Sequence, residues 1–289
     1  MNKKLFGIAA TLISATYFGF MPLFMKTVYA SGGNSFTAAF LRFALSLPTL
    51  YIYHRVRGIS LKISWEEMKQ VLIITLCGYG GTTILVFTAY NYIASGLATT
   101  IHFLYPTVTV AGLMIFYKEK IKPSKIFCVV LCLVGVLLFY NGGGEVSLKG
   151  ILLALCSAGT YGFYTIYLGK CCLKDMIATK RLFHMHWVGA LMMGVIGLVS
   201  GGFDFVMAPL GWGIMFLVAT LTTFVGALGY QIGVDTIGSE NTAMLSTFEP
   251  ITSIIVGILV YSETMTVKIV LGILAILTST VIIAKTESK

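Results

Sequence analysis

The chain has 289 residues, of which 57% are hydrophobic and only 11% are charged, and its mean hydropathy is +0.90. A soluble domain carries about 25% charged residues, because it must cover its surface with solvated groups. The composition therefore excludes an ordinary soluble domain and indicates contact with lipid. The net charge of +9 does not indicate nucleic-acid binding, because the basic residues stand in short clusters between apolar runs and form no continuous stripe.

From the N-terminus onward the chain is a succession of apolar runs. Each has about the 20 residues that a helix needs to cross the hydrocarbon core of a bilayer. The first run continues to Val28, which is too long for the apolar part of a signal peptide. The runs lack the period of two that a membrane β-barrel needs. Ten transmembrane helices are predicted, over about 5–28, 36–53, 70–93, 96–117, 124–140, 150–169, 182–201, 212–233, 241–261 and 266–284.

The basic residues between the runs predict an orientation. With the N-terminus inside, sixteen Lys and Arg residues fall in inside segments and three in outside segments. Lys and Arg accumulate on the cytoplasmic side of membrane proteins. Both termini are therefore expected in the cytoplasm, which an even number of spans satisfies.

The two halves of the chain repeat each other. Residues 93–106 resemble residues 237–250 at an offset of 144 residues, and at that offset Glu119 meets Glu263. Because each copy has five runs, the second must enter the membrane in the opposite sense. We expect an all-α integral membrane protein of ten transmembrane helices in two inverted five-helix repeats, 1–145 and 146–289.

The first and sixth runs each carry small residues every four positions along one helix face. Such a stripe lets two helices approach closely in lipid. The residues are Gly7, Thr11, Ala15 and Gly19 in the first run, and Gly150, Ala154, Ala158 and Gly162 in the sixth.

Several short motifs occur in order along both halves, and with them the chain resembles the EamA family of the drug/metabolite transporter superfamily. They are Leu41-Arg42-Phe43, Ser95-Gly-Leu-Ala98, the prolines Pro106 and Pro250, and the acids Glu119 and Glu263. The resemblance covers nearly the whole chain. It implies a multi-pass carrier of the bacterial inner (plasma) membrane, often an exporter of amino acids, metabolites or drugs.

Pro106 and Pro250 interrupt the fourth and ninth runs at equivalent points. Proline lacks a backbone N–H and clashes with the carbonyl four residues earlier. In lipid such a carbonyl needs a partner, so it is expected to face the bundle interior or a wet cavity. We assign both prolines a structural or gating role in helices that line a central cavity; a simple packing kink is the alternative.

Glu249 is the only carboxylate within a predicted run, and Arg42 is the only base well inside one. An ionisable group inside a membrane is a functional candidate by default. Glu249 could bind a substrate ammonium, carry a proton or pair with a base. An acid before this proline is also common in the family, so a structural role is its alternative. Arg42 could hold a substrate carboxylate bidentately; we favour a structural role in which it bonds carbonyls of a neighbouring helix.

The remaining candidate binding residues are aromatic. His102 lies one turn before Pro106 and is either a cavity hydrogen-bond donor or a satisfied core residue. Four deep tyrosines could line a cavity for an amphipathic solute, with core packing as the alternative: Tyr17, Tyr79, Tyr161 and Tyr230. His184 and His186 are expected at the membrane interface.

These features predict a secondary transporter and exporter of small metabolites, such as amino acids or amphipathic organic compounds, that works by alternating access. No enzyme is expected, because no H-E-x-x-H motif, acid pair or Ser/His/Asp set appears. No catalytic residue, cofactor or metal site is predicted. The expected partners are a small-molecule substrate, protons as coupling ion, and the lipid bilayer. A flippase of lipid or lipid-linked substrates is the alternative, and it predicts a groove open sideways to lipid.

Overall fold

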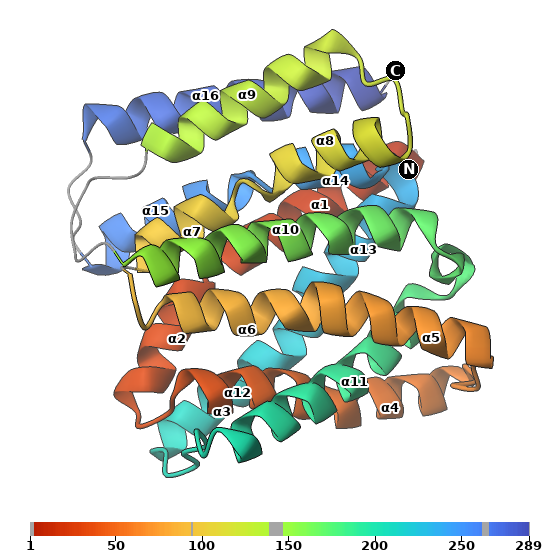
Figure 1. The fold of residues 1–289 in the computed structure, drawn as a ribbon, viewed down its shortest axis with the longest axis vertical. Helices are drawn as coiled ribbons and strands as arrows, with labels where there is room; N and C mark the ends of the chain where they lie inside the picture. Colours follow the sequence, from red (N-terminus) through yellow and green to blue (C-terminus); the bar gives the residue numbers. More distant parts are fainter. Residues whose placement is uncertain (1–2, 94, 139–146, 262–265, 289) are drawn as a thin grey trace.

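The computed structural model describes residues 3–93, 95–138, 147–261 and 266–288. All regular structure in these ranges is helical, and the helices run side by side in one bundle (Figure 1). Eight helical stretches are long and apolar enough to cross a bilayer, and they are Lys3–Ala30, Ser35–Arg57, Trp65–Ala89, Leu97–Phe116, Leu148–Lys170, Ala178–Val199, Pro209–Ile237 and Ser239–Val260. Two more apolar helices, Pro123–Leu138 and Val267–Ile283, are shorter. The predicted ten runs all overlap helices, and among the described residues eight helical stretches meet the length and hydropathy of a membrane span.

Many of these stretches consist of two or three consecutive helices. In the first half the elements are α1 (Lys3–Gly19), α2 (Met21–Ala30), α3 (Ser35–Ala44), α4 (Ser46–Arg57), α5 (Trp65–Ile73), η1 (Ile74–Tyr79), α6 (Gly80–Ala89), α7 (Ser95–His102), α8 (Tyr105–Phe116) and α9 (Pro123–Leu138). In the second half they are α10 (Leu148–Lys170), η2 (Cys172–Asp175), α11 (Ala178–Val199), α12 (Pro209–Leu221), η3 (Thr222–Ala227), α13 (Leu228–Ile237), α14 (Ser239–Leu245), α15 (Phe248–Tyr261) and α16 (Val267–Ser288).

Local sequence signals begin and end several of these helices. The Asn34 side chain accepts a hydrogen bond of 2.9 Å from the Thr37 N–H and caps α3. Ser64 and Glu67 form a reciprocal capping box at the start of α5. Gly58 ends α4 in the left-handed region at φ 65°, where glycine has no steric penalty. These caps fix where the chain leaves and re-enters the bundle.

The two halves interrupt their helices at corresponding places. The stretch Trp65–Ala89 contains the π-helix η1, and the stretch Pro209–Ile237 contains the π-helix η3. The stretch Leu97–Phe116 breaks between α7 and α8, just before Pro106, and the stretch Ser239–Val260 breaks between α14 and α15, just before Pro250. Proline explains the second pair of breaks. Short π-helical segments inside longer helices are frequent at functional sites.

Small residues let α1 pack directly on helices of the second half. A Cβ added to Gly7 of the α1 stripe would lie 1.9 Å from the Thr236 hydroxyl oxygen of α13. One added to Gly229 of α13 would lie 2.8 Å from the Ala10 carbonyl oxygen, so α1 and α13 are in close contact. In α10 the corresponding Gly162 faces α8, where a Cβ would lie 2.7 Å from the Val108 side chain. Both predicted stripes of small residues therefore lie at close helix contacts.

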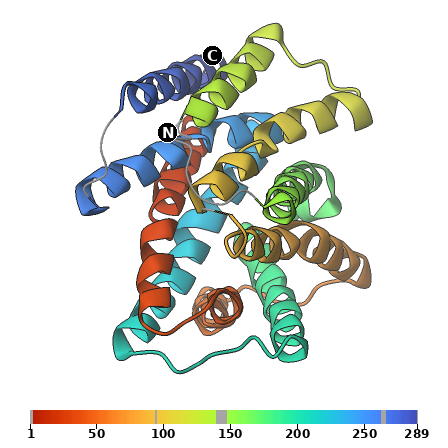
Figure 2. The same cartoon turned by 60° about the vertical axis from the view of Figure 1, so that its left-hand side comes forward.

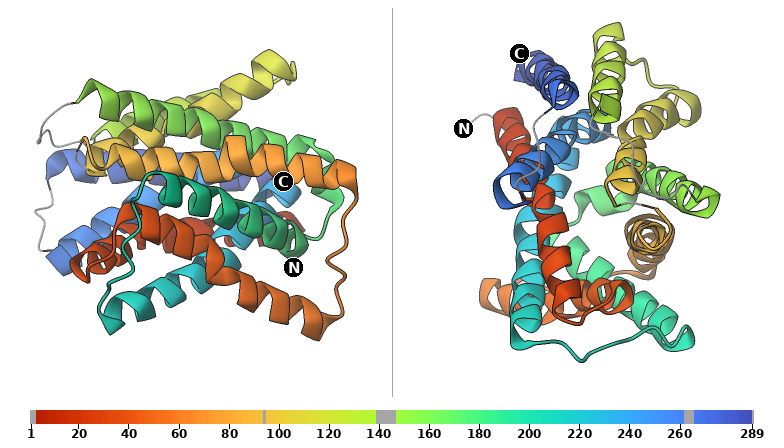
Figure 3. Two further views of the ribbon diagram at one scale, coloured as in Figure 1. Left: turned by 60° about the horizontal axis from the view of Figure 1, so that its bottom comes forward. Right: turned by 90° about the vertical axis from the view of Figure 1, so that its left-hand side faces the viewer.

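The bundle is elongated across the helix axes (Figure 1). Helices α9 and α16 pair at one edge, and α3, α4 and α11 lie at the opposite edge (Figures 1 and 2). Seen along the helices, the remaining segments fill the space between these edges (Figure 3, right). Both ends of the described chain lie at the same end of the bundle, where α4, α8 and α10 also finish. We call this the basic end, because Arg57, Lys118 and Lys170 lie there.

Candidate functional site

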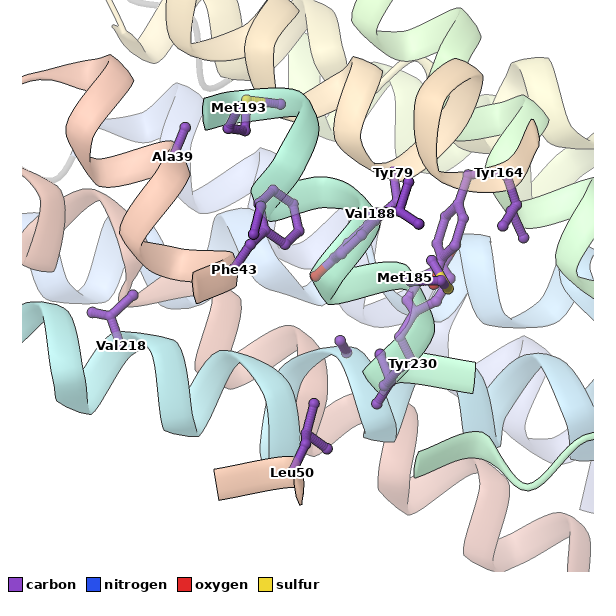
Figure 4. Packing of buried hydrophobic residues seen from close by; sticks show 14 of the residues in the cluster. Ala39, Phe43, Leu50, Tyr79, Tyr164, Met185, Val188, Met193, Val218 and Tyr230 are labelled. Carbon is purple, nitrogen blue, oxygen red and sulfur yellow. The ribbon is translucent and has the colours of Figure 1, made fainter. Parts of the chain in front are cut away.

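Five tyrosines form a continuous cluster where the two halves meet. This aromatic cluster consists of Tyr79 from η1, Tyr105 from α8, Tyr161 and Tyr164 from α10, and Tyr230 from α13. The Tyr164 ring centroid lies 5.3 Å from that of Tyr79 and 5.9 Å from that of Tyr230. Tyr161 lies 5.5 Å from Tyr230 and 4.6 Å from Tyr105. Figure 4 shows Tyr79, Tyr164 and Tyr230 reaching the same core region from different helices.

Helix geometry explains how these rings come together. Tyr161 and Tyr164 are three residues apart on α10, so they share one face of the helix. Gly78 leaves room for them, since a Cβ there would lie 3.0 Å from the Tyr164 Cβ. Tyr79 is the last residue of η1, and the π-helix directs it toward α10 and α11. The structure thus brings together three of the predicted tyrosines, Tyr79, Tyr161 and Tyr230, and adds Tyr105 and Tyr164.

Arg42 marks one side of the cluster. Its side chain is buried, with 8% of the residue exposed. The Nη2 atom donates a hydrogen bond of 2.6 Å to the Tyr79 hydroxyl, and the guanidinium carbon lies 5.1 Å from the Tyr79 ring centroid. The Nε atom has no hydrogen-bond partner in the described part of the chain. Among the described residues no carboxylate forms an ion pair with Arg42 within 4.0 Å, and no carbonyl accepts a hydrogen bond from it.

His186 lies beside Arg42 in the core of the bundle, and its predicted depth at the membrane interface stays a prediction. It is fully buried on α11. Its ring packs on Tyr79 at 6.1 Å and edge-on to Phe43 at 5.4 Å. Its Nδ1 lies 2.5 Å from the Ser46 hydroxyl, while Nε2 has no partner. His184, also expected at the interface, is buried too, with its Nε2 bonded to the Leu61 carbonyl at 2.9 Å.

Glu249 is a second charged residue near the cluster. It stands in the first turn of α15, next to Pro250. The carboxylate interacts electrostatically with Arg42 and with the hydroxyls of Tyr161 and Tyr230. In the described part of the chain no hydrogen bond or ion pair reaches it directly. The two predicted intramembrane charges therefore face the same aromatic cluster without touching each other.

His102 and Tyr17 border this region. His102 is half-buried, its Nδ1 lies 3.0 Å from the Ser157 hydroxyl, and its ring lies 5.4 Å from that of Tyr161. Tyr17 is buried on α1, and its hydroxyl lies 3.3 Å from the Thr222 hydroxyl of η3. It also interacts electrostatically with Arg42. Pro106 and Pro250 lie close in sequence to His102 and Glu249, at the starts of α8 and α15.

A second buried charge pair was missed from the sequence. Arg181 is 0% exposed and donates from Nη2 to Asp235 Oδ2 at 2.8 Å. It also bonds Gln231 Oε1 and the Leu173 carbonyl, each at 2.8 Å. Both charges lie within helices, since α11 begins at Ala178 and α13 ends at Ile237. Asp235 lies within the spanning stretch Pro209–Ile237, so the interpretation of Glu249 as the only carboxylate inside a span is wrong. Arg181 lies near the start of α11 and does not contradict Arg42 as the base well inside a span.

The outer surface carries one further feature. An apolar groove of about 760 Å³ runs between α8 and α10 and is lined by residues that include Gly112, Phe116, Gly159 and Phe163. Phe116 and its neighbour Ile115 are 79% and 68% exposed, so the groove opens to the outside of the bundle. The described residues contain no group of three or more His, Cys, Asp or Glu side chains that could hold a metal ion.

A bundle of apolar helices that encloses buried charges and tyrosines is a multi-pass membrane protein with an internal polar site. The chain belongs to the EamA-like transporter family, whose model matches residues 5–141 and again residues 148–285. It is therefore a membrane transporter, and the double match agrees with the repeat in its sequence. The acid Glu263, which formed part of the resemblance, lies outside the described residues.

Relatives of the chain are also described as transporters. An uncharacterized transporter of Bacillus subtilis, YvbV, is 28% identical over 247 residues, covering 81% of this chain and 76% of its own length. An uncharacterized transporter of Archaeoglobus fulgidus is 22% identical over 239 residues, covering 81% and 83%. A solved crystal structure matches with a TM-score of 0.78 at 16% identity, over 97% of this chain and 95% of its own. That likeness concerns the fold.

Proposed function

We propose that the protein is a secondary carrier that exports small organic solutes, such as amino acids or amphipathic compounds, across the bacterial inner membrane. The aromatic cluster is its binding site, with Arg42 and Glu249 beside it. The presence of these two charges carries the proposal, since Arg42 is buried, Glu249 is partly buried, and the two form no ion pair in the described structure. Ionisable residues inside membrane segments are costly and commonly mark substrate or ion pathways.

The repeat supports a mechanism of alternating access. The proposed binding site takes Arg42 and Tyr79 from the first half and Tyr164, Tyr230 and Glu249 from the second. In carriers built from inverted repeats, the site lies at the repeat interface near the membrane midplane, and one repeat rocks against the other. The paired breaks before Pro106 and Pro250 give this motion two corresponding hinges.

The proposed orientation places the basic end in the cytoplasm. Arg57, Lys118 and Lys170 gather there with both termini, as expected for the cytoplasmic side. Ion pairs join helix ends at the same place. Lys125 bonds Glu240 at 3.0 Å, and Lys170 bonds Glu119. We infer that these pairs close the cytoplasmic side in this conformation and separate when the site opens inward.

Glu249 is the proposed carrier of coupling protons. It is the carboxylate that faces the aromatic cluster without a direct partner among the described residues. A carboxylate in this position can bind a proton or a substrate ammonium in turn, and competition between the two would couple their movements.

The groove between α8 and α10 favours a second candidate, a flippase of lipid or lipid-linked substrates. Its lining is apolar and it opens to the outside of the bundle, as a lateral path for an acyl chain requires. The buried charges favour the solute carrier, because the groove lining contains none of them.

The experiment is a flux assay with purified protein in proteoliposomes. A pooled set of labelled amino acids and cationic dyes is followed for uptake and efflux, with and without a pH gradient. Movement of one class, with its gradient-driven part lost in Glu249→Gln or its rate reduced in His102→Ala, supports the carrier. If no soluble solute moves but labelled lipids do, the flippase replaces it.

A further inference from the structure

The chain buries two arginines inside its helices, and their surroundings differ. Arg181 satisfies its guanidinium with a carboxylate, an amide oxygen and a backbone carbonyl. A buried charge held in this way needs no further ligand. Arg42 has one hydrogen-bond acceptor in the described structure, the neutral Tyr79 hydroxyl. Arg181 is thus a structural arginine with its guanidinium satisfied, and Arg42 differs from it because it has a single neutral acceptor.

The donors around Arg42 are only partly used. Its buried Nε has no acceptor. The Tyr79 hydroxyl accepts from Nη2, and its own proton has no acceptor among the described residues. A guanidinium presents its N–H groups in a planar fork that fits a carboxylate. Arg42 and Tyr79 therefore offer unsatisfied donors at one position.

The neighbouring groups set the polarity of this position. Ser46 donates to the Phe43 carbonyl at 2.7 Å, so His186 Nδ1–H donates to Ser46 and the unpartnered Nε2 is an acceptor. His186 thus supplies no negative charge that could pair with the Arg42 guanidinium. Glu249 interacts with Arg42 only through space. Among the described residues, no anionic group is in direct contact with Arg42 to balance its charge.

We propose that Arg42 and Tyr79 form the carboxylate subsite of the transported solute, which is an organic carboxylate with an apolar body. The carboxylate accepts from Arg42 and from the Tyr79 hydroxyl, and the body packs on the rings of the aromatic cluster, starting with Tyr164 at 5.3 Å from Tyr79. This inference rests on the proposed carrier function and assigns its substrate class. It replaces the anchor role that the sequence favoured for Arg42.

The test compares carboxylates with their neutral amides. Phenylacetate, indoleacetate and hexanoate, each paired with its primary amide, are titrated calorimetrically against the full-length protein in nanodiscs. Wild type is expected to bind at least one carboxylate about 10- to 100-fold more tightly than its amide, the range for hydrogen bonds to a charged group. Arg42→Gln is expected to remove this preference. Arg55→Gln, an exposed base at the end of α4, is the matched control and keeps it.

Two further variants keep the test decisive if Arg42→Gln does not fold. Arg42→Lys retains the charge but loses the planar fork, and Tyr79→Phe retains the ring but loses the hydroxyl. Both are expected to reduce the carboxylate preference by several-fold and to leave amide binding unchanged. An unchanged preference in all folded variants contradicts the subsite, as does binding of no carboxylate by wild type.

The pooled flux assay separates this inference from the carrier itself. If cations or neutral solutes move while no carboxylate binds, the subsite is wrong and the carrier stands. If nothing moves, the carrier is wrong, and the subsite falls with it.

Discussion

Gly19 of α1 lies directly against the backbone of Glu249 in α15: a Cβ at Gly19 would lie 2.7 Å from the Glu249 carbonyl oxygen and 2.4 Å from the Thr252 Cβ. The Ser253 hydroxyl donates to the Gly19 carbonyl at 2.9 Å and fixes the same contact. The position of the acid Glu249 near the aromatic cluster therefore depends on a glycine in the other half of the chain.

Gly19→Ala is expected to destabilise the protein by about 1–3 kcal/mol, because the added methyl must push α15 away. It should also reduce transport, since Glu249 moves with α15. Thermal unfolding in detergent measures the first effect, and flux in proteoliposomes measures the second. Gly213→Ala is the control, because a Cβ there meets nothing within 4 Å. Equal stability of the two variants would contradict the close contact.

Asp235→Asn leaves Arg181 buried without its counter-charge. Breaking a buried ion pair from one side costs roughly 3–5 kcal/mol. We expect a correspondingly lower unfolding temperature in detergent. Glu66→Gln breaks the exposed Lys69–Glu66 pair, whose side chains are 45% and 72% exposed, and is expected to change stability by less than about 1 kcal/mol. If Asp235→Asn unfolds at the wild-type temperature, the Arg181 network does not stabilise the fold.

Thiol labelling tests the proposed orientation. Cys172 is exposed in η2, at the basic end. Next to it, burial raises the pKa of the Cys171 thiol, so less of it is the reactive thiolate. In a chain whose other cysteines are replaced, a membrane-impermeant maleimide should label Cys172 in inside-out vesicles and not in intact cells. Val206→Cys, 86% exposed in the link between α11 and α12, should show the reverse. Labelling of Cys172 in intact cells would invert the orientation.

Glu249→Gln tests proton coupling. The amide cannot carry a proton on and off, so a pH gradient should no longer drive solute accumulation. Exchange of solute without net proton movement should survive, because the aromatic cluster and Arg42 are unchanged. Glu66→Gln is the matched control for the loss of one carboxylate. Gradient-driven accumulation that persists in Glu249→Gln would exclude this residue as the coupling site.

Much of the fold was predictable from bilayer thickness and proline chemistry. Apolar runs of spanning length located the helices, and the missing N–H groups of Pro106 and Pro250 located two of the breaks. The small-residue stripes located the close contacts of α1 and α10. These signals are local, so a single sequence carries them.

The features that escaped prediction depend on partners far away in the chain. Arg181 lies just outside the predicted run 182–201, and its burial depends on the contact with Asp235, more than fifty positions later. The contacts of His186 escaped prediction for the same reason, because its neighbours Phe43, Ser46 and Tyr79 all come from the first half. The π-helices η1 and η3 arise within ordinary apolar runs that carry no local signal for them.

Counterflow in proteoliposomes tests the central claim most directly. Vesicles are loaded with an unlabelled solute, chosen from the class that moves in the pooled assay, and diluted into a trace of the labelled one without any pH gradient. A carrier with one site that faces each side in turn predicts rapid, transient accumulation of label in wild type and none in empty liposomes. Label that only equilibrates, at a rate independent of the internal solute, would contradict alternating access at the aromatic cluster.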